Sequence, residues 1–264
     1  MMIHHEHHSS VDSTNVAALR AWRAAAGGAN RPLLITADRQ TAGRGRAGRP
    51  WASPAGGVWM SLAWPLAGST EHYQAAPLAA GWAVLRALDE QLGLNASLKW
   101  PNDLLVHDCK VAGILCQIEP TGERPVLIVG IGVNADLDVA DLGPGLRWPA
   151  TTIRELLGRP CDPKQLASNF AEHLVDVLRV YDTDGLGPIR QSIEDRLAWR
   201  GAELCCEMPN DERIDGCLEG IDRFGRLVLR THEKTLPLCV GEIRHVSRLP
   251  SPTAALGAAA ALRS

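Results

Sequence analysis

The chain contains a glycine- and arginine-rich stretch, Gln40–Trp51, with the sequence QTAGRGRAGRPW. Glycine lets backbone amides approach a ligand closely, and arginine offers a planar fork of donors that matches carboxylate and phosphate oxygens. The stretch therefore predicts a loop that wraps a small anionic ligand, with Trp51 covering an apolar or aromatic part of it. Arg/Gly segments also bind RNA through its phosphates, so a nucleic-acid-binding module is the alternative.

The composition of the whole chain favours the small ligand. Its 264 residues suit one large domain, or one domain with a small appendage. The formal net charge is −3 at pH 7, whereas dedicated nucleic-acid-binding proteins usually carry a basic excess. Seven cysteines without a Cys-x-x-Cys pair indicate reduced thiols in a cytoplasmic protein. No apolar run reaches membrane-spanning length, and no charged start followed by an apolar stretch marks a signal peptide.

Hydrophobic periodicity predicts strands and helices on both sides of the loop. Apolar or alternating runs predict strands at 33–37, 58–64, 104–106, 110–118 and 126–133. Helical spacing predicts helices at 76–92, 153–157 and 163–181, and a further helix within 186–197. The sequence Asp12-Ser13-Thr14-Asn15 precedes another helical pattern. It therefore predicts a helix N-terminus whose hydroxyl and amide groups are also able to bind a polar ligand.

Asp103 and Lys110 occupy the outer ends of two strands in a predicted hairpin, which turns at Asp108–Cys109. Their charged heads are expected to converge. In one interpretation Lys110 only prevents an exposed edge strand from pairing with another chain. In the functional interpretation its point charge, beside the arginines, holds together a carboxylate and a phosphate that must react.

The hydrophobic pattern of the sequence changes near residue 200. Short alternating runs separated by turn signals predict a small five-stranded barrel from there on. We therefore expect a disordered, His-rich start at 1–10, a catalytic domain at 11–199, the barrel at 200–249 and an Ala/Pro-rich tail at 250–264. Metal binding by the His-rich start is expected to be adventitious.

Several motifs appear in an order that carries a family resemblance. They are Asp12–Asn15, Gln40 with Gly43–Trp51, Lys99–Asp103, Lys110-x-x-Gly113-Ile114-Leu115, and Gly130-x-Gly132-x-Asn134. From roughly Val11 to Leu249 the chain resembles the biotin protein ligases, and lipoate ligases of similar fold lack the pairing of the Gly43–Trp51 and Lys99–Asp103 blocks. The resemblance implies an α+β fold with a mixed β-sheet flanked by helices, as in class II synthetases and the biotin–lipoate ligase catalytic domain. It also implies a small C-terminal SH3-like β-barrel.

The resemblance further implies an activity and a set of site residues. Such enzymes make biotinyl-5′-adenylate from biotin and ATP with Mg²⁺, then transfer biotin to a lysine of a biotin carboxyl carrier domain of a biotin-dependent carboxylase. The catalytic residues implied are Arg44, Arg46, Lys110 and Asp103, with Asp103 orienting the incoming lysine. The biotin-binding residues implied are Ser13, Thr14, Asn15, Gln40, Gly43, Arg44, Gly45, Arg46, Lys110 and Gly113. The ATP- or adenylate-binding residues implied are Arg46, Arg49, Trp51, Asn102, Lys110, Asn134 and Trp148, and no metal site is fixed by the protein alone.

Two-function members of this family carry a helix-turn-helix domain before the Ser-Thr-Asn motif, whereas twelve residues precede Ser13 here. DNA and membranes are therefore not expected as partners, and a homodimer is compatible with the sequence. One alternative is a lipoate or octanoate ligase, which Gln40 and the Ser13–Asn15 group disfavour because they suit a polar ureido head. The other is the nucleic-acid-binding module, which predicts strongly salt-dependent binding and indifference to biotin.

Overall fold

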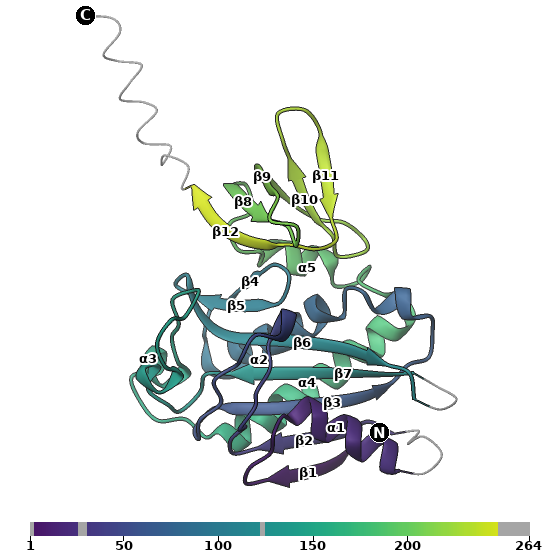
Figure 1. The fold of residues 1–264 in the computed structure, drawn as a ribbon, viewed down its shortest axis with the longest axis vertical. Coiled ribbons are helices and arrows are strands. Elements are labelled where there is room, and N and C mark those ends of the chain that lie inside the picture. The colour runs from purple at the N-terminus through teal and green to yellow at the C-terminus, as the bar shows by residue number, and fades with distance from the viewer. Residues whose placement is uncertain (1–2, 26–30, 122–124, 248–264) are drawn as a thin grey trace, which may run out of the picture. The chain divides into compact units, whose positions relative to one another are not determined.

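The computed structural model describes residues 3–25, 31–121 and 125–247, which belong to two compact units (Figure 1). The larger unit comprises Met1–Ala198 with Arg223–Gly225, and the smaller comprises Trp199–Asp222 with Arg226–Ser264. The predicted boundary between residues 199 and 200 lies beside this division. Each unit is built on its own sheet.

The apolar strands of the larger unit form one seven-stranded mixed sheet in the order β1-β2-β3-β7-β6-β5-β4. The strands are β1 (His4–His8), β2 (Leu33–Ala37), β3 (Val58–Pro65), β4 (Ser97–Lys99), β5 (Asp103–Val106), β6 (Cys109–Glu119) and β7 (Val126–Val133). β1 pairs with β2 in parallel, and the remaining neighbours are antiparallel. The five predicted strands are therefore confirmed, whereas the sequence did not predict β1 or the three-residue β4.

Helices cover both faces of this sheet. The helices of the larger unit are α1 (Thr14–Ala24), α2 (Ala76–Leu92), α3 (Ile153–Leu157), α4 (Pro163–Asp184) and α5 (Arg190–Asp195), with short 3₁₀ turns at Arg46–Gly48, Thr70–Tyr73 and Val139–Leu142. Figure 1 shows α1 in front of the sheet and α2 and α4 behind it. The predicted helices are confirmed, and α2 ends at Gly93, which adopts a φ of 64° in the left-handed region. α4 continues to Asp184 because the first residue that breaks it is Gly185.

Residues His4–His8 form strand β1, so the prediction of disorder for residues 1–10 was wrong for this segment. β1 satisfies the free backbone edge of β2, and its histidines find partners. The His5 and His7 rings each lie 2.9 Å from the hydroxyl oxygen of Thr36. Backbone pairing and these contacts outweigh a composition that is typical of a disordered terminus.

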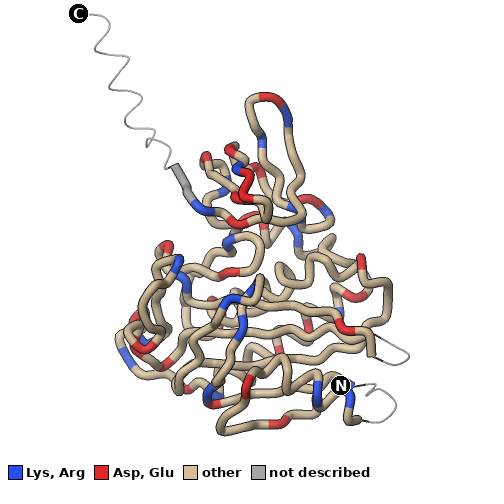
Figure 2. Tube along the Cα trace, in the orientation of Figure 1, with Lys and Arg blue, Asp and Glu red and all other residues tan. Residues whose placement is uncertain are grey.

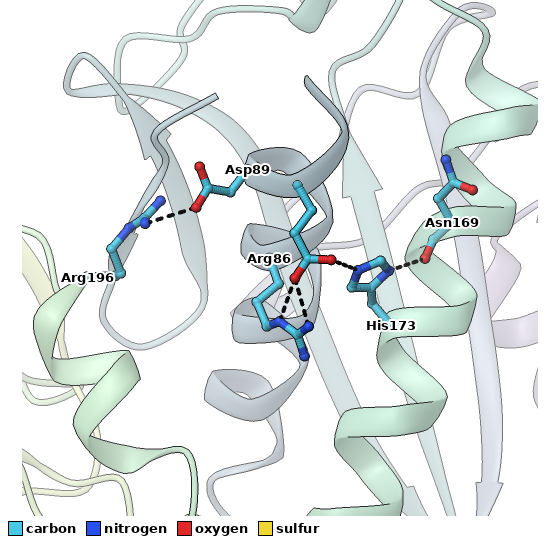
Figure 3. A network of polar contacts seen from close by, with 6 residues as sticks. Arg86, Asp89, Asn169, His173 and Arg196 are labelled. Atoms are coloured by element: carbon cyan, nitrogen blue, oxygen red, sulfur yellow. Dashed lines mark hydrogen bonds and ion pairs between the residues drawn. The ribbon is translucent and has the colours of Figure 1, made fainter. Parts of the chain in front are cut away.

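A polar clamp joins α2 to α4 behind the sheet (Figure 3). The Glu90 carboxylate accepts hydrogen bonds from Arg86 of its own helix at 2.7 and 3.0 Å. It also lies 3.0 Å from Nε2 of His173, whose Nδ1 lies 2.9 Å from the Asn169 carbonyl oxygen. The hydrogen bonds from His173 and Arg86 hold the pKa of Glu90 below its usual value. The clamp therefore links the two long helices at the protein surface.

The smaller unit contains one antiparallel sheet in the order β11-β10-β9-β8-β12. Its strands are β8 (Glu203–Glu207), β9 (Arg213–Ile221), β10 (Leu227–Arg230), β11 (Thr235–Leu238) and β12 (Glu242–Ser247). Among the described residues no pairing joins the edge strands β11 and β12, so this sheet is not a closed barrel. The predicted tail at 250–264 lies outside the described residues.

Within the part of the chain that the structure describes, no helix combines the length and the apolar character needed to cross a membrane.

Candidate active site

A row of facing residues runs across the sheet and ends in charged side chains. Gly132 of β7 lies opposite Trp59 of β3 and Gly113 of β6. Gly113 in turn faces Asp103 of β5, and Asp103 faces Lys99 of β4. Directly opposite residues point to the same side of a sheet, so two glycines, a carboxylate and an ammonium group share one face. This is the face on which α1 packs, because Ala63 and Ile128, at even spacing from Trp59 and Gly132, belong to the α1 cluster.

Lys110 joins this face because the β5–β6 register shifts between Leu104 and Leu105. A shift of this kind turns a side chain that would otherwise point to the opposite face. The Lys110 Nζ lies 2.5 Å from Asp103 Oδ1, and the Lys99 Nζ lies 3.6 Å from Asp103 Oδ2. The predicted convergence of Asp103 and Lys110 is thus confirmed. One carboxylate is shared by two lysines, which leaves a net positive charge at this end of the row.

The glycines create room for the Trp51 ring to lie against the strands. A Cβ at Gly132 would lie 2.6 Å from Trp51 Nε1, and one at Gly113 would lie 3.1 Å from the far edge of the ring. The Lys110 Nζ lies 4.9 Å from the centroid of the same indole. Trp51 Nε1 is buried without a hydrogen-bond partner in the structure, so it is a donor that a ligand can satisfy. We call Gly113, Gly130 and Gly132 the glycine floor.

The other end of the floor is polar and lies at the N-terminus of α1. A Cβ at Gly130 would overlap Asn15 Oδ1, so the Asn15 amide rests directly on this glycine. Asn15 Oδ1 accepts a hydrogen bond from Ser61 at 2.6 Å, and Asn15 Nδ2 donates one to Gln117 at 2.7 Å. Ser61 Oγ also lies 2.7 Å from Thr14 Oγ1. Ser61 is fully buried and Asn15 is 7% exposed, so the network is held in place.

Gln40 connects this polar end to the loop. Its Oε1 accepts hydrogen bonds from the backbone N–H and hydroxyl of Thr14 at 2.7 and 3.1 Å, and its Nε2 donates to Ser53 at 2.7 Å. A Cβ at Gly43 would lie 2.6 Å from Ser53 Oγ, which explains the need for glycine there. Ser13 is buried at the N-cap position just before α1, but its side chain makes no capping hydrogen bond.

The arginines of the loop divide into two groups. Arg46 Nη1 donates to Asn102 Oδ1 at 3.3 Å, and Asn102 Nδ2 donates to the carbonyl of Ile114 on β6 at 2.7 Å. Arg46 and Asn102 are therefore brought to the site. Arg44 is exposed and forms a backbone bridge with Pro50, while Gly45 bonds to the Arg49 carbonyl at 2.7 Å. Arg44 and Arg49 therefore lie in the loop on either side of Arg46, joined to it by these backbone contacts.

Asn134 and Trp148 contact the two lysines of this row. Asn134 is buried, and its Nδ2 donates to the carbonyls of Thr151 at 3.1 Å and Lys110 at 3.3 Å. Its Oδ1 is buried without a hydrogen-bond partner in the structure. The Trp148 ring centroid lies 4.2 Å from the Lys99 Nζ. Both residues therefore lie beside the charged end of the row.

Sequence reasoning missed several polar residues of this site. Ser61, Ser53 and Gln117 carry hydrogen bonds of the polar end, and Lys99 completes the charge cluster. Ser61 had a readable signal, since it is the one hydroxyl in the apolar strand 58–64. Gln117 and Ser53 had none, because their partners are distant in sequence.

The site has an ordered polarity and no metal cluster of its own. It passes from the polar group around Asn15, across the glycine floor and Trp51, to the lysines around Asp103. No group of three His, Cys, Asp or Glu side chains in the described residues is arranged to hold a metal ion. Figure 2 shows Lys and Arg interspersed with Asp and Glu along the larger unit, a pattern that does not favour a nucleic-acid-binding surface. The geometry suits a small molecule with a polar head, a flat apolar body and an acidic end.

Comparison with known proteins identifies close relatives of this arrangement. Residues 9–134 match the model of the biotin/lipoate A/B protein ligase family. The chain is 35% identical to the biotin–[acetyl-CoA-carboxylase] ligase of Paracoccus denitrificans, over 83% of this chain and 91% of the relative. It is 32% identical to the bifunctional ligase/repressor BirA of Bacillus subtilis, over 88% of this chain and 70% of the relative. Among solved structures, the biotin protein ligase from Aquifex aeolicus in complex with biotin and ATP superposes with a TM-score of 0.78 at 29% identity, covering 93% of this chain and 99% of that one.

Proposed function

The chain belongs to the biotin/lipoate A/B protein ligase family, and we propose that it is a biotin–protein ligase. It activates biotin with ATP to biotinyl-5′-adenylate and transfers biotin to the target lysine of a biotin carboxyl carrier domain. Relatives named as biotin–[acetyl-CoA-carboxylase] ligases and a structural neighbour that binds biotin and ATP support this function.

The observation that carries the proposal is the ordered polarity of the site. Biotin has a polar ureido head, an apolar bicyclic body with an aliphatic chain, and a terminal carboxylate. The hydrogen-bonding group around Asn15 and Gln40 suits the head, and Trp51 on the glycine floor suits the body. Lys110 suits the carboxylate. Lipoate and octanoate lack the polar head, so the buried amide and hydroxyl network of Asn15 and Ser61 favours biotin.

The cationic end performs the activation. Attack of the biotin carboxylate on the α-phosphorus of ATP brings two anions together, so positive charge must screen them first. Lys110 and Arg46 supply this charge, and Arg44 adds to it when the loop encloses the substrates. Asn102 positions Arg46, and Asn134 and Arg49 contribute to the adenylate site. Asp103 then orients the amine of the incoming carrier lysine.

Mg²⁺ fits this site as a companion of the nucleotide. Asp103 is already paired with two lysines, and Mg²⁺ commonly keeps several waters and binds through substrate phosphates. The ion would supply additional positive charge to the phosphates. The sheet of the smaller unit is proposed to be an SH3-like module, and the free cysteines are consistent with a cytoplasmic protein. A homodimer stays a prediction.

The function is tested by incubating the protein with α-labelled ATP and biotin, lipoate or octanoate, and then adding a carrier domain. We expect a labelled adenylate and carrier labelling with biotin alone among the three acids. Adenylation of lipoate or octanoate without biotin would replace this function with that of the other ligases. Binding of RNA or DNA that falls steeply with salt, together with indifference to biotin, would support the nucleic-acid-binding alternative instead.

A further inference from the structure

Trp148 contacts the charge cluster through its ring face and its indole N–H. The Lys99 Nζ lies 4.2 Å from the ring centroid, within the range of a cation–π interaction. Trp148 Nε1 donates a hydrogen bond of 2.7 Å to the carbonyl of Asp108, in the turn between β5 and β6. The indole is therefore fixed at both the lysine and the hairpin turn.

The residues after Trp148 run beside Lys110 and brace its backbone. The Lys110 N–H donates to the Pro149 carbonyl at 2.6 Å, and the Thr151 N–H donates to the Lys110 carbonyl at 3.0 Å. These bonds form a short parallel bridge between Lys110 and Ala150. One segment therefore contacts both lysines that share Asp103.

The two lysines differ in burial. The Lys99 side chain is 3% exposed and that of Lys110 is 22% exposed. A buried ammonium group is costly unless charged or aromatic partners offset its desolvation. Asp103 and the Trp148 ring are such partners for Lys99. Lys110, by contrast, is accessible to a ligand.

We propose that Trp148 is a positioning residue that holds Lys99 as the permanent counter-ion of Asp103. Lys110 is then the exchangeable partner: it releases Asp103 and turns to the anionic substrates. Lys99 keeps the Asp103 carboxylate paired and oriented. This inference rests on the proposed ligase function. It assigns the ring face of Trp148 to Lys99, whereas the family resemblance implied that Trp148 frames the adenylate.

The test is a double-mutant cycle on biotin-dependent pyrophosphate release, with kcat and KM for ATP measured separately. We expect Trp148→Leu to lower kcat about tenfold, because a desolvated cation–π contact is lost, and to leave KM for ATP unchanged. Trp148→Phe keeps an aromatic face and should stay within about threefold of wild type. In a Lys99→Met background, Trp148→Leu should cost less than about twofold more, since its partner is already absent.

The matched control is Leu146→Ala, an exposed residue of the same segment that should retain wild-type kinetics. Circular dichroism and urea unfolding check that each variant is folded. Equal losses from Trp148→Leu in the two backgrounds, or a raised KM for ATP with unchanged kcat, would overturn the positioning role. A wild-type protein that makes no biotinyl-adenylate would remove the ligase function itself, and this inference with it.

Discussion

Replacing Gly130 by alanine should damage the polar end of the site and measurably destabilise the protein. The new Cβ would overlap Asn15 Oδ1 and lie 2.9 Å from Asn15 Cγ, so the buried amide must move. Its hydrogen bonds with Ser61 at 2.6 Å and Gln117 at 2.7 Å would then be lost. Each is worth about 1 kcal/mol net, which gives a loss of about 2 kcal/mol in the free energy of unfolding. Ser61 limits the loss, because its hydroxyl can still donate to Thr14.

Urea unfolding followed by tryptophan fluorescence measures this loss, and calorimetry measures biotin affinity, which should fall in parallel. The control is Gly68→Ala, because a Cβ at Gly68 meets nothing within 4 Å. In an Asn15→Ala background the clash is absent, so Gly130→Ala should add little to the cost. If Gly130→Ala matches the Gly68→Ala control in both stability and biotin affinity, the assignment of Asn15 to the glycine floor is wrong.

Three further predictions concern the charge cluster, the helix clamp and a helix cap. Lys110→Ala should slow adenylate formation by on the order of 10²–10³ while leaving the urea midpoint unchanged; a normal single-turnover rate would contradict its role. Because hydrogen bonds lower the pKa of Glu90 from 4.5, its stabilising contribution is present above that pH and lost as the pH falls through the lowered value. Thermal melts should therefore separate wild type from Glu90→Gln at pH 7 and converge as the pH falls through the lowered pKa of Glu90, and a constant difference would refute the linkage. Thr152→Ala removes the oxygen that accepts the Glu155 N–H at 3.1 Å, so it should cost about 1 kcal/mol in urea unfolding, whereas Thr152→Ser should cost far less.

Local pattern predicted most of the larger sheet and the helices that cover it. The apolar runs at 33–37 and 126–133 and the helical spacing at 76–92 each depend on neighbours in sequence, and all three appear as predicted. The His-rich start was misjudged because its stability comes from the unpaired edge of β2, which lies some thirty residues away in sequence. Composition alone carries no information about such an edge.

The motifs pointed to several residues of the candidate site but not to their arrangement. The motifs named Asp103, Lys110 and Asn15, yet the face that Lys110 occupies depends on a register shift that no residue pattern announces. The glycine pattern at 130–132 was legible as a motif, but its purpose is visible only when Asn15 and Trp51 lie on it. Partners that meet across distant strands are fixed by tertiary pairing, which explains why Ser61 and Gln117 escaped notice.

The glycine floor limits how the acid-binding site can be enlarged by mutation. Glycine is already the smallest residue, so Gly113 and Gly132 offer no further volume to a redesign. Room for a bulkier analogue must therefore come from Trp51, whose ring lies against these glycines, and replacing Trp51 by a smaller apolar side chain is the change that provides it. An enzyme engineered in this way would accept larger acids than the natural enzyme, in which the Trp51 side chain fills this space.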